Sequence, residues 1–269
     1  MLDAVARDGL VLLGCGKMGT ALLTGWLAAG VPPPSVWVVE PNPSDWLKGA
    51  GVHLNAALPN APAVALVAVK PQMMGGALPA LQAMGNGTTL FVSIAAGTSI
   101  ATFAEVLGDR TPIVRTMPNT PAMVGRGITG ICGNAHAGAS GLALAKALMQ
   151  AVGEVVELAG EDQIDAVTAV SGSGPAYVFH LIEAMAAAGV AEGLPADVAM
   201  KLARATVCGA GELAYRTPES AAQLRINVTS PGGTTAAALA HLMDEGTGLP
   251  PLMRRAVHAA AMRGRELGK

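Results

Sequence analysis

The fold is decided by Leu10-Val-Leu-Leu-Gly-Cys-Gly-Lys-Met-Gly19, a short apolar run that leads into a GxGxxG pattern. The run predicts a strand, and the small-residue stretch Met18–Ala29 predicts a helix after it. In such a turn Gly14 permits the tight bend, Gly16 lets the backbone approach a pyrophosphate, and Gly19 allows close helix packing. The phosphates would lie at the N-terminus of the helix. The motif therefore predicts a dinucleotide site, with an ordinary glycine-rich turn as the alternative.

Outward from this motif, the first half of the chain alternates short β-branched runs with small-residue stretches of helical length. This is the rhythm of βαβ units, which form a parallel sheet with helices on both faces. We therefore expect an α/β N-terminal Rossmann domain with a parallel doubly wound sheet over residues 1–160. The expected strands are Leu10–Leu13, Val36–Val39, Val64–Val69, Thr89–Ile94, Ile113–Arg115, Ile128–Cys132 and Val155–Leu158.

The rhythm changes near Glu161, where β-rich runs stop and alanine, leucine and methionine dominate. From Asp165 to Glu212, only seven of 48 residues are charged. Helices that are apolar nearly all round must be buried on several sides, which predicts a homo-oligomer. We expect an all-α domain over residues 161–269 that buries its apolar faces in an interface between subunits. Its expected helices include Tyr177–Glu192, Ala196–Tyr215 and Leu252–Leu267.

The composition excludes several classes of protein. Lys and Arg number 17 against 19 Asp and Glu, so the net charge is −2, and no basic block offers a footprint for nucleic acid. Cys15, Cys132 and Cys208 are widely spaced, which fits reduced thiols and no metal site. The uncharged stretch Ala166–Ile182 of the second half is glycine-interrupted and shorter than the roughly 20 apolar residues that span a bilayer. With no secretory leader layout at the start, we expect a cytoplasmic protein that binds no membrane.

The acid at the end of the second expected strand bears on cofactor choice. Glu40 follows Gly19 by 21 residues, close to the ~20 expected for a carboxylate that binds the ribose hydroxyls. Such a carboxylate repels a 2′-phosphate, so the sequence favours NADH over NADPH. The alternative is that Glu40 turns to solvent while Asn42 and Ser44 cradle a phosphate.

Three more turns follow expected strands, at the sheet edge where ligands bind in open α/β folds. They are Ala68-Val-Lys-Pro71, Ala95-Ala-Gly97 and Met117-Pro-Asn-Thr-Pro121. Small residues in the first two would let a nicotinamide ribose lie against the backbone, and the prolines of the third stiffen a loop that shapes a substrate pocket. The alternatives are a solvated Lys70 and an ordinary turn at residues 95–97.

Two glycine-rich tracts interrupt the helical half. In Ser171-Gly-Ser-Gly-Pro-Ala-Tyr177 glycine costs about 1 kcal/mol if helical, so either a neighbouring helix or a ligand approaches the backbone. The second tract is Ser230-Pro-Gly-Gly-Thr-Thr235, preceded by Asn227. It predicts a helix start with unpaired N–H groups, which suits a small carboxylate better than a plain cap.

The absence of an obvious acid catalyst narrows the chemistry. The five histidines are scattered, and Lys201 lies in an apolar expected helix without a clear partner. Reduction of a C=O bond needs a proton donor, usually His or Lys. A protonated imine already carries the charge that attracts a hydride, so a hydroxyl such as that of Thr235 is an adequate donor. By elimination, the sequence favours a C=N over a C=O substrate.

Taken together, these tracts resemble the pyrroline-5-carboxylate reductase family, which catalyses the last step of proline synthesis. The resemblance implies that the helical domain intertwines with a second subunit, that the active site lies between the domains, and that dimers assemble further into decamers. The matching tracts run in the family's order along nearly the whole chain and are Gly14-Cys-Gly-Lys-Met18, Ala68-Val-Lys-Pro71, Ala95-Ala-Gly97, Met117-Pro-Asn-Thr-Pro121, Asp165-Ala-Val-Thr168, Ser171-Gly-Ser-Gly-Pro-Ala-Tyr177 and Ser230-Pro-Gly-Gly-Thr-Thr235.

The resemblance also implies roles for individual residues. Backbone N–H groups of residues 232–234 would grip the substrate carboxylate, and the Thr235 hydroxyl would bond to the ring nitrogen as proton donor. Hydride would then pass from nicotinamide C4 to C5 of L-1-pyrroline-5-carboxylate, giving L-proline. Together with Glu40 and Asn119, the residues expected to hold NADH or NADPH are Leu13, Gly14, Cys15, Gly16, Lys17, Met18, Ala68, Val69, Lys70, Pro71, Ala95, Ala96 and Gly97. Those expected to bind the substrate are Asn227, Ser230, Gly232, Gly233, Thr234 and Thr235.

Three positions depart from the family pattern, and one of them is Thr234, where alanine is also found and a larger side chain would narrow the pocket. Glu40 stands where some members carry a serine used with NADPH, and Asn55 is out of step with an asparagine that some members place beside the ribose. Two alternatives stay open, a reductase of a related cyclic imine carboxylate and a nucleotide-sensing homologue without catalysis. The second alternative predicts damage to residues 230–235, and that tract is intact.

Overall fold

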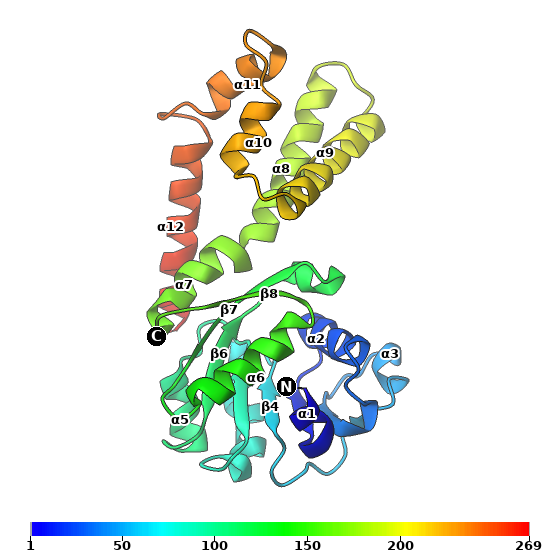
Figure 1. Cartoon of the computed structure of the whole chain (residues 1–269), viewed down its shortest axis with the longest axis vertical. Coiled ribbons are helices and arrows are strands. Elements are labelled where there is room, and N and C mark those ends of the chain that lie inside the picture. Colours follow the sequence, from blue (N-terminus) through cyan, green and yellow to red (C-terminus); the bar gives the residue numbers. More distant parts are fainter. Residues whose placement is uncertain (1, 269) are drawn as a thin grey trace. The chain divides into compact units, whose positions relative to one another are not determined.

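The computed structural model describes residues 2–268 and divides into two compact units (Figure 1). The first unit comprises Met1–Gly172 and Ala260–Lys269, and the second comprises Ser173–Ala259. The sequence placed its boundary at residue 160, whereas the contacts divide the chain at Gly172. The reason is that the segment after residue 160 packs on the sheet, with Ile164 and Ala169 at 0% exposure.

The first unit is built on one eight-stranded sheet in the order β3-β2-β1-β4-β5-β6-β7-β8. The central strand β1 pairs in parallel with β2 and β4, and its Leu10 lies opposite Val36 and Val64. Every strand residue of β1, β4, β5 and β6 is buried, as expected for strands covered on both faces. The strands are β1 Leu10–Leu13, β2 Val36–Val39, β3 His53–Leu54, β4 Val64–Val67, β5 Leu90–Ser93, β6 Ile113–Met117, β7 Gly127–Gly133 and β8 Gly153–Glu157.

Two details of the sheet differ from the expected one. Strand β7 runs antiparallel to β6, while β8 runs parallel to β7. The β6–β7 connection, residues 118–126, is shorter than the dozen or more residues that a parallel crossover needs. The two-residue strand β3 was not predicted; its His53 ring stacks on Trp37 at a centroid distance of 4.6 Å. The α/β doubly wound architecture itself is confirmed.

Helices cover the sheet on both faces. On one face, α1, α2 and α6 pack a cluster that includes Trp26, Leu148 and the β1 residues Leu10 and Leu12. On the other face, α4, the 3-10 segment Leu78–Met84 and α5 pack against the alternate strand residues. The helices of this unit are α1 Asp3–Asp8, α2 Lys17–Ala28, α3 Asp45–Lys48, α4 Met74–Ala77, α5 Ile100–Leu107, α6 Gly138–Gln150 and α7 Ile164–Val167.

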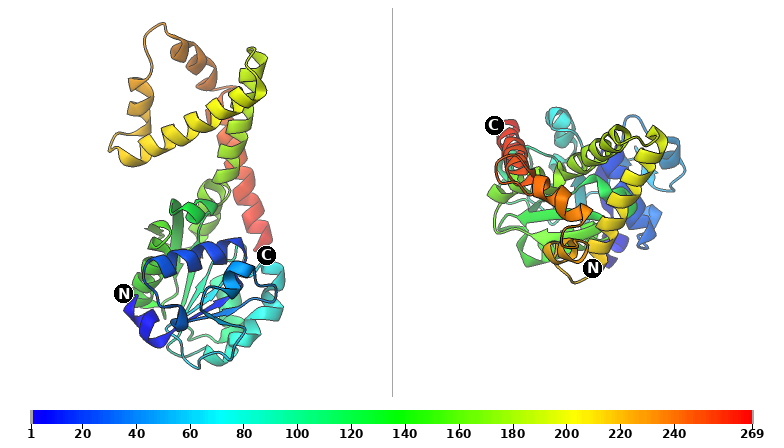
Figure 2. Two further views of the ribbon diagram at one scale, coloured as in Figure 1. Left: turned by 90° about the vertical axis from the view of Figure 1, so that its right-hand side faces the viewer. Right: turned by 90° about the horizontal axis from the view of Figure 1, so that it is seen from above.

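The second unit is helical, and α8 packs along α9 (Figure 2). Within residues 173–259, the buried apolar side chains are Ala186, Ala199 and Ala203. Large apolar side chains lie exposed on the same helices, including Phe179 at 60% and Leu202 at 52%. The helices are α8 Gly174–Ala191, α9 Ala196–Arg216, α10 Ala221–Asn227, α11 Thr234–Leu242 and α12 Leu249–Leu267, whose last residues belong to the first unit.

Candidate functional site

The glycine-rich loop between β1 and α2 has the geometry that its spacing predicts. Gly14 has a φ of +89°, and a Cβ there would lie 2.9 Å from the Ala68 carbonyl oxygen. A Cβ on Gly19 would lie 2.6 Å from the carbonyl oxygen of Gly14. By contrast, a Cβ on Gly16 would meet nothing within 4 Å. The structure therefore explains Gly14 and Gly19 by the fold, while the open space at Gly16 fits a ligand.

Three of the expected cofactor tracts meet at one edge of the sheet. The N–H of Gly14 donates to the Val39 carbonyl oxygen at 2.8 Å, and that of Ala68 donates to the Leu13 carbonyl oxygen at 2.8 Å. The N–H of Ile94 donates to the Val67 carbonyl oxygen at 3.1 Å. These bonds join the carboxyl ends of β2, β1, β4 and β5 in order. The turns that begin at residues 14, 68 and 95 are thus neighbours, at the edge where α/β sheets bind ligands.

Glu40 turns its carboxylate toward the glycine-rich loop. Its Oε2 accepts the Cys15 N–H at 2.8 Å, and its Oε1 accepts the Asn42 N–H at 2.9 Å. The alternative in which Glu40 faces solvent does not match these contacts. The carboxylate adds a negative charge beside the loop where phosphates are expected, and its role toward a ribose stays a prediction.

Asn55 stands out in the sequence as a departure from the family pattern, but its contacts with Glu40 were not predicted. It has a φ of +51°, its Oδ1 accepts the Glu40 N–H at 2.9 Å, and its Nδ2 donates to the Glu40 carbonyl oxygen at 3.0 Å. The amide therefore braces the backbone of the acid that ends β2. The sequence signal for this turn is the residue type itself, because asparagine directly after His53-Leu54 tolerates a positive φ more readily than most residues.

The loop after β5 is closely packed. Ala95 is buried, and its N–H donates to the Ser93 Oγ at 3.2 Å. Gly97 has a φ of +70°, and a Cβ there would lie 2.9 Å from the carbonyl oxygen of Leu267 at the end of α12. The loop thus needs glycine at residue 97 for its own packing. Lys70, in the neighbouring turn, is exposed.

Asn119 is placed differently from the expectation that it binds the cofactor. It is 8% exposed, its Nδ2 donates to the Ser171 carbonyl oxygen at 3.1 Å, and its Oδ1 accepts the Ile128 N–H at 3.0 Å. These bonds hold the proline-rich loop to β7 and to the five-residue π-helical turn Thr168–Gly172. The side chain is therefore used inside the protein, because a buried amide must satisfy its polar atoms.

The expected substrate tract begins α11 in the second unit. Gly233 is the residue before the helix, Gly232 has a φ of +69°, and Thr235 is half-buried. The N–H groups of Thr234 and Thr235 belong to the first turn, where a helix has no internal acceptor for them. The Gly233 N–H, however, donates to the Ser230 carbonyl oxygen at 3.0 Å. Its expected bond to a carboxylate is therefore replaced by a turn bond.

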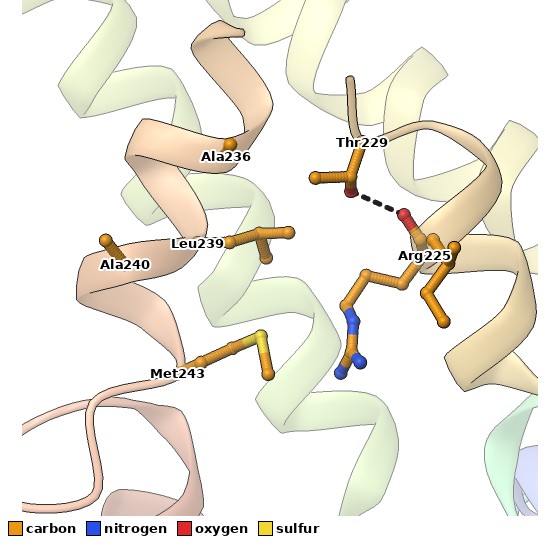
Figure 3. Close-up of a pocket in the computed structure, with 7 residues that line it drawn as sticks. Arg225, Thr229, Ala236, Leu239, Ala240 and Met243 are labelled. Atoms are coloured by element: carbon orange, nitrogen blue, oxygen red, sulfur yellow. Dashed lines mark hydrogen bonds between the residues drawn. The ribbon is translucent and has the colours of Figure 1, made fainter. Parts of the chain in front are cut away.

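Asn227 and a nearby pocket complete this region. The Asn227 amide is bonded on the surface to Gln223 at 2.8 Å and to Glu219 at 2.9 Å. A pocket of about 480 Å³ lies between α10 and α11 (Figure 3). Its walls are mostly apolar, and Arg225 and Thr229 are the polar residues among them. The lining residues are Arg225, Ile226, Thr229, Ala236, Leu239, Ala240 and Met243.

Two of the three cysteines, Cys15 and Cys132, are buried. Burial, followed by the charge of Glu161, raises the pKa of Cys132 to about 11, and burial raises the pKa of Cys15. Both thiols therefore stay protonated at neutral pH, which makes them poor nucleophiles. Within residues 2–268, no three His, Cys, Asp or Glu side chains gather in a way that could hold a metal ion.

Similar proteins are known for nearly the whole length of the chain. The family model described as pyrroline-5-carboxylate reductase dimerisation matches residues 161–267, and that described as NADP oxidoreductase coenzyme F420-dependent matches residues 10–97. A pyrroline-5-carboxylate reductase of Synechocystis sp. is 44% identical over 267 residues, covering 97% of this chain and 98% of the relative. The chain belongs to the pyrroline-5-carboxylate reductase family. Another family member, from Pseudomonas aeruginosa, is 40% identical and covers 97% of each chain.

Solved structures of the family agree. A pyrroline-5-carboxylate reductase from Coxiella burnetii is 35% identical, with a TM-score of 0.88 over 97% of this chain and 99% of that chain. A pyrroline carboxylate reductase from Plasmodium falciparum, solved with NADP bound, is 28% identical, with a TM-score of 0.83 over 98% and 99% of the two chains. The family resemblance predicted from the sequence is confirmed.

The family membership bears on the apolar second unit. The helical run Glu161–Ala191 has 31 residues and is long and apolar enough to cross a membrane by length and composition alone. The whole run lies inside the region that matches the dimerisation model, residues 161–267. Self-association is therefore a property of this family that accounts for the exposed apolar side chains.

Proposed function

We propose that this chain reduces the C=N bond of L-1-pyrroline-5-carboxylate to L-proline with a nicotinamide cofactor. The observation that carries the proposal is the likeness to pyrroline-5-carboxylate reductases along 97% of the chain, at up to 44% identity. The intact tract Ser230-Pro-Gly-Gly-Thr-Thr235 supports it, since a homologue without catalysis has no need of that tract.

The first unit is proposed to hold the cofactor. The open space at Gly16 and the 12-residue helix α2 behind it fit a pyrophosphate, because the helix N-terminus attracts negative charge. When bound, the nicotinamide supplies the hydride. The residues proposed to bind the cofactor are the loop Leu13–Met18, Glu40, and the turns 68–71 and 95–97. Asn119 is proposed to hold the proline-rich loop in place instead, since its amide is bonded to Ser171 and Ile128.

The second unit is proposed to hold the substrate. The unpaired N–H groups of Thr234 and Thr235, with that of Gly232, suit the carboxylate, since charge-assisted bonds at a helix start favour an anion. The Thr235 hydroxyl is proposed to donate a hydrogen bond to the ring nitrogen. The lone pair of the neutral imine nitrogen accepts this bond, and as hydride adds to C5 the nitrogen takes up the proton and becomes the amine of proline.

Replacement of Thr235 tests the mechanism. We expect Thr235→Val to lower kcat for pyrroline-5-carboxylate reduction by about 10²-fold or more, the usual contribution of a positioned proton donor. Thr235→Ser keeps the hydroxyl and serves as the matched control, with kcat within a few-fold of the wild type. An unchanged kcat in Thr235→Val removes that hydroxyl from the mechanism. A wild-type protein that oxidises neither nicotinamide with this substrate overturns the proposed function.

The cofactor preference is proposed to be NADH, because the Glu40 carboxylate repels a 2′-phosphate. We expect kcat/KM to be higher with NADH than with NADPH, and Glu40→Gln to narrow the difference while keeping an acceptor for the Cys15 N–H. The Plasmodium falciparum relative was solved with NADP bound, so the proposed preference for NADH is not taken from that protein. A tenfold preference of the wild type for NADPH would overturn the assignment.

The assembly proposed is an intertwined homodimer that associates further, up to a decamer, in the cytoplasm and away from membranes. Residues 161–267 match a dimerisation model, which supports the dimer. Native mass spectrometry gives the subunit number directly.

The alternative reaction is the reduction of a related substrate, a six-membered cyclic imine carboxylate. Comparing kcat/KM for the five-membered and the six-membered ring decides between the two substrates.

A further inference from the structure

One carboxylate ties three segments of the first unit together. The Glu161 Oε1 accepts the Ile100 N–H at 2.8 Å and the Arg115 Nη1 at 2.7 Å. Ile100 begins α5, Arg115 lies in β6, and Glu161 begins the 3-10 turn that leads into α7. The Arg115 side chain is 8% exposed and that of Glu161 is 31% exposed. The contact is therefore an ion pair largely removed from water, with a backbone N–H added to it.

The segment held by this carboxylate is the loop expected to meet the nicotinamide. Residues 95–97 lie between β5 and Ile100, so the Glu161 bond fixes the downstream end of that loop. The upstream end is fixed at Ser93, whose Oγ accepts the Ala95 N–H at 3.2 Å and whose carbonyl oxygen accepts the Thr116 hydroxyl at 2.9 Å. Both ends of the loop are thus attached to strand β6.

Apolar packing also joins the segments that the Glu161 carboxylate connects. Met117, Cys132 and Ile164 form a small buried cluster, and Ala96 and Ile100 pack against it. A pocket of about 180 Å³ beside the ion pair is lined by Arg115 together with the loop residues Gly97 and Ser99. A shift of Glu161 would therefore move loop 95–97, because the apolar contacts and the hydrogen bonds described above both hold this loop.

The ion pair is more than a surface contact. The Arg115 Nε is buried and has no hydrogen-bond partner within residues 2–268, so the guanidinium depends on its remaining contacts. Removing one member of a buried pair leaves the other charge poorly compensated. The segment around Arg115 and Ile100 should then rearrange rather than keep its place.

We propose that Glu161 is a positioning residue for the reductase, which fixes loop 95–97 against β6 and so sets the place of the nicotinamide end of the cofactor. Glu161 is also the first residue of the region that matches the dimerisation model. The same carboxylate thus connects the cofactor loop to the segment that leads into the dimerisation helices. The inference rests on the proposed function, because the role of loop 95–97 is part of it.

The test separates the two ends of the cofactor. Dissociation constants of Glu161→Ala are measured for NADH and NADPH, and for ADP and 2′,5′-ADP, which lack the nicotinamide. We expect the first two to rise and kcat to fall, each by ~10- to 100-fold, the usual result of a misplaced reacting group. The constants for ADP and 2′,5′-ADP, and the KM for pyrroline-5-carboxylate, should stay within about twofold, since the glycine-rich loop is untouched.

Two variants serve as controls. Glu161→Gln keeps an oxygen that accepts from both donors but removes the charge, and should recover part of the affinity for NADH and NADPH. Glu157→Ala removes the exposed ion pair between Glu157 and Lys146, 2.8 Å long, and should leave every constant unchanged. Should Glu161→Ala fail to fold, the double variant Arg115→Met/Glu161→Ala removes both charges and is expected to show the same pattern.

The outcomes are distinct. Unchanged binding of NADH and NADPH in the folded variants overturns the positioning role, as does an equal loss for ADP, which would indicate general destabilisation. A wild type that binds the nicotinamides and reduces no pyrroline-5-carboxylate overturns the proposed function alone, because the binding comparison does not need turnover.

Discussion

In the first unit, the sheet buries leucine, valine, phenylalanine and tryptophan side chains on both faces, with Trp26 and Phe91 at 0% exposure. In the second unit, residues 173–259 bury three alanines while Phe179 and Leu202 lie more than half exposed. The two units have similar apolar character in sequence, so the difference lies in where the apolar side chains find partners. The first unit finds them within one chain.

The apolar side chains of the second unit find their packing partners in another copy of the chain. Large exposed apolar patches are rare on monomeric proteins and mark interaction surfaces. The match to a dimerisation model identifies the partner as a second subunit. Stability of the second unit should therefore depend on protein concentration, as it does wherever association completes a core.

The largest expected effect comes from placing a charge on the exposed face of α8. Phe179→Glu would bury a carboxylate in the subunit interface, at a cost of several kcal/mol. We expect dimer dissociation to become at least about a thousandfold more favourable, which corresponds to ~4 kcal/mol. Native mass spectrometry at micromolar concentration should show monomers, and reductase activity should be lost.

The matched control is Trp46→Glu, which charges a 43% exposed side chain of the first unit and should leave the assembly unchanged. Persistence of the oligomer in Phe179→Glu would contradict the comparison between the units.

The next effect concerns the core of the first unit. Trp26 is fully buried, and its Nε1–H donates to the Leu148 carbonyl oxygen at 2.9 Å. We expect Trp26→Ala to lower the free energy of unfolding by about 3–5 kcal/mol through the lost contacts and the cavity. Urea titrations should give the same loss at every protein concentration, since the contacts lie within one chain.

Trp26→Phe loses the hydrogen bond and part of the ring and should cost less. A loss in Trp26→Ala that disappears at high concentration would mean that this core also depends on the second subunit.

The smallest effect separates folding from binding inside the first unit. Gly16 has a φ of −67° and open space around it, so Gly16→Ala should leave the free energy of unfolding unchanged. The added methyl group would meet the pyrophosphate, and we expect the Kd for the nicotinamide cofactor to rise about tenfold, or ~1.4 kcal/mol. Titration calorimetry measures it. Gly76→Ala, at another open position, is the control, and equal affinities in the two variants would exclude a phosphate contact at Gly16.

The fold was predictable wherever local pattern and packing agree. Strands β1 and β2 have the predicted ends, because β1 is a short apolar run between Gly9 and Gly14, and a proline lies two residues beyond each end of β2. The direction of β7 was not predicted, because the expected strand ends, Arg115 and Ile128, leave a dozen residues between them, enough for a parallel crossover, whereas the observed strands leave fewer. The two-residue β3 is too short to leave a pattern.

The candidate site was predictable in its backbone and less so in its side chains. The bend at Gly14 follows from spacing, whereas the bonds of Asn119 and Gly233 depend on which polar atoms the fold brings near. Likewise Asn55 braces Glu40 across 15 residues, a contact that no local pattern specifies. Glu161 escaped notice for the same reason, since its partners lie 46 and 61 residues away.

The close approach of Leu267 to Gly97 has a consequence for biosynthesis. Chains emerge from the ribosome amino end first, and domains generally fold as units in that order. Synthesis of Ser173–Ala259 takes roughly 4–17 s at the usual rate of translation. During that interval the sheet is complete, while the loop after β5 still awaits the end of α12. The predicted nicotinamide side of the site is therefore the last part of the first unit to mature, after the entire association surface has been translated.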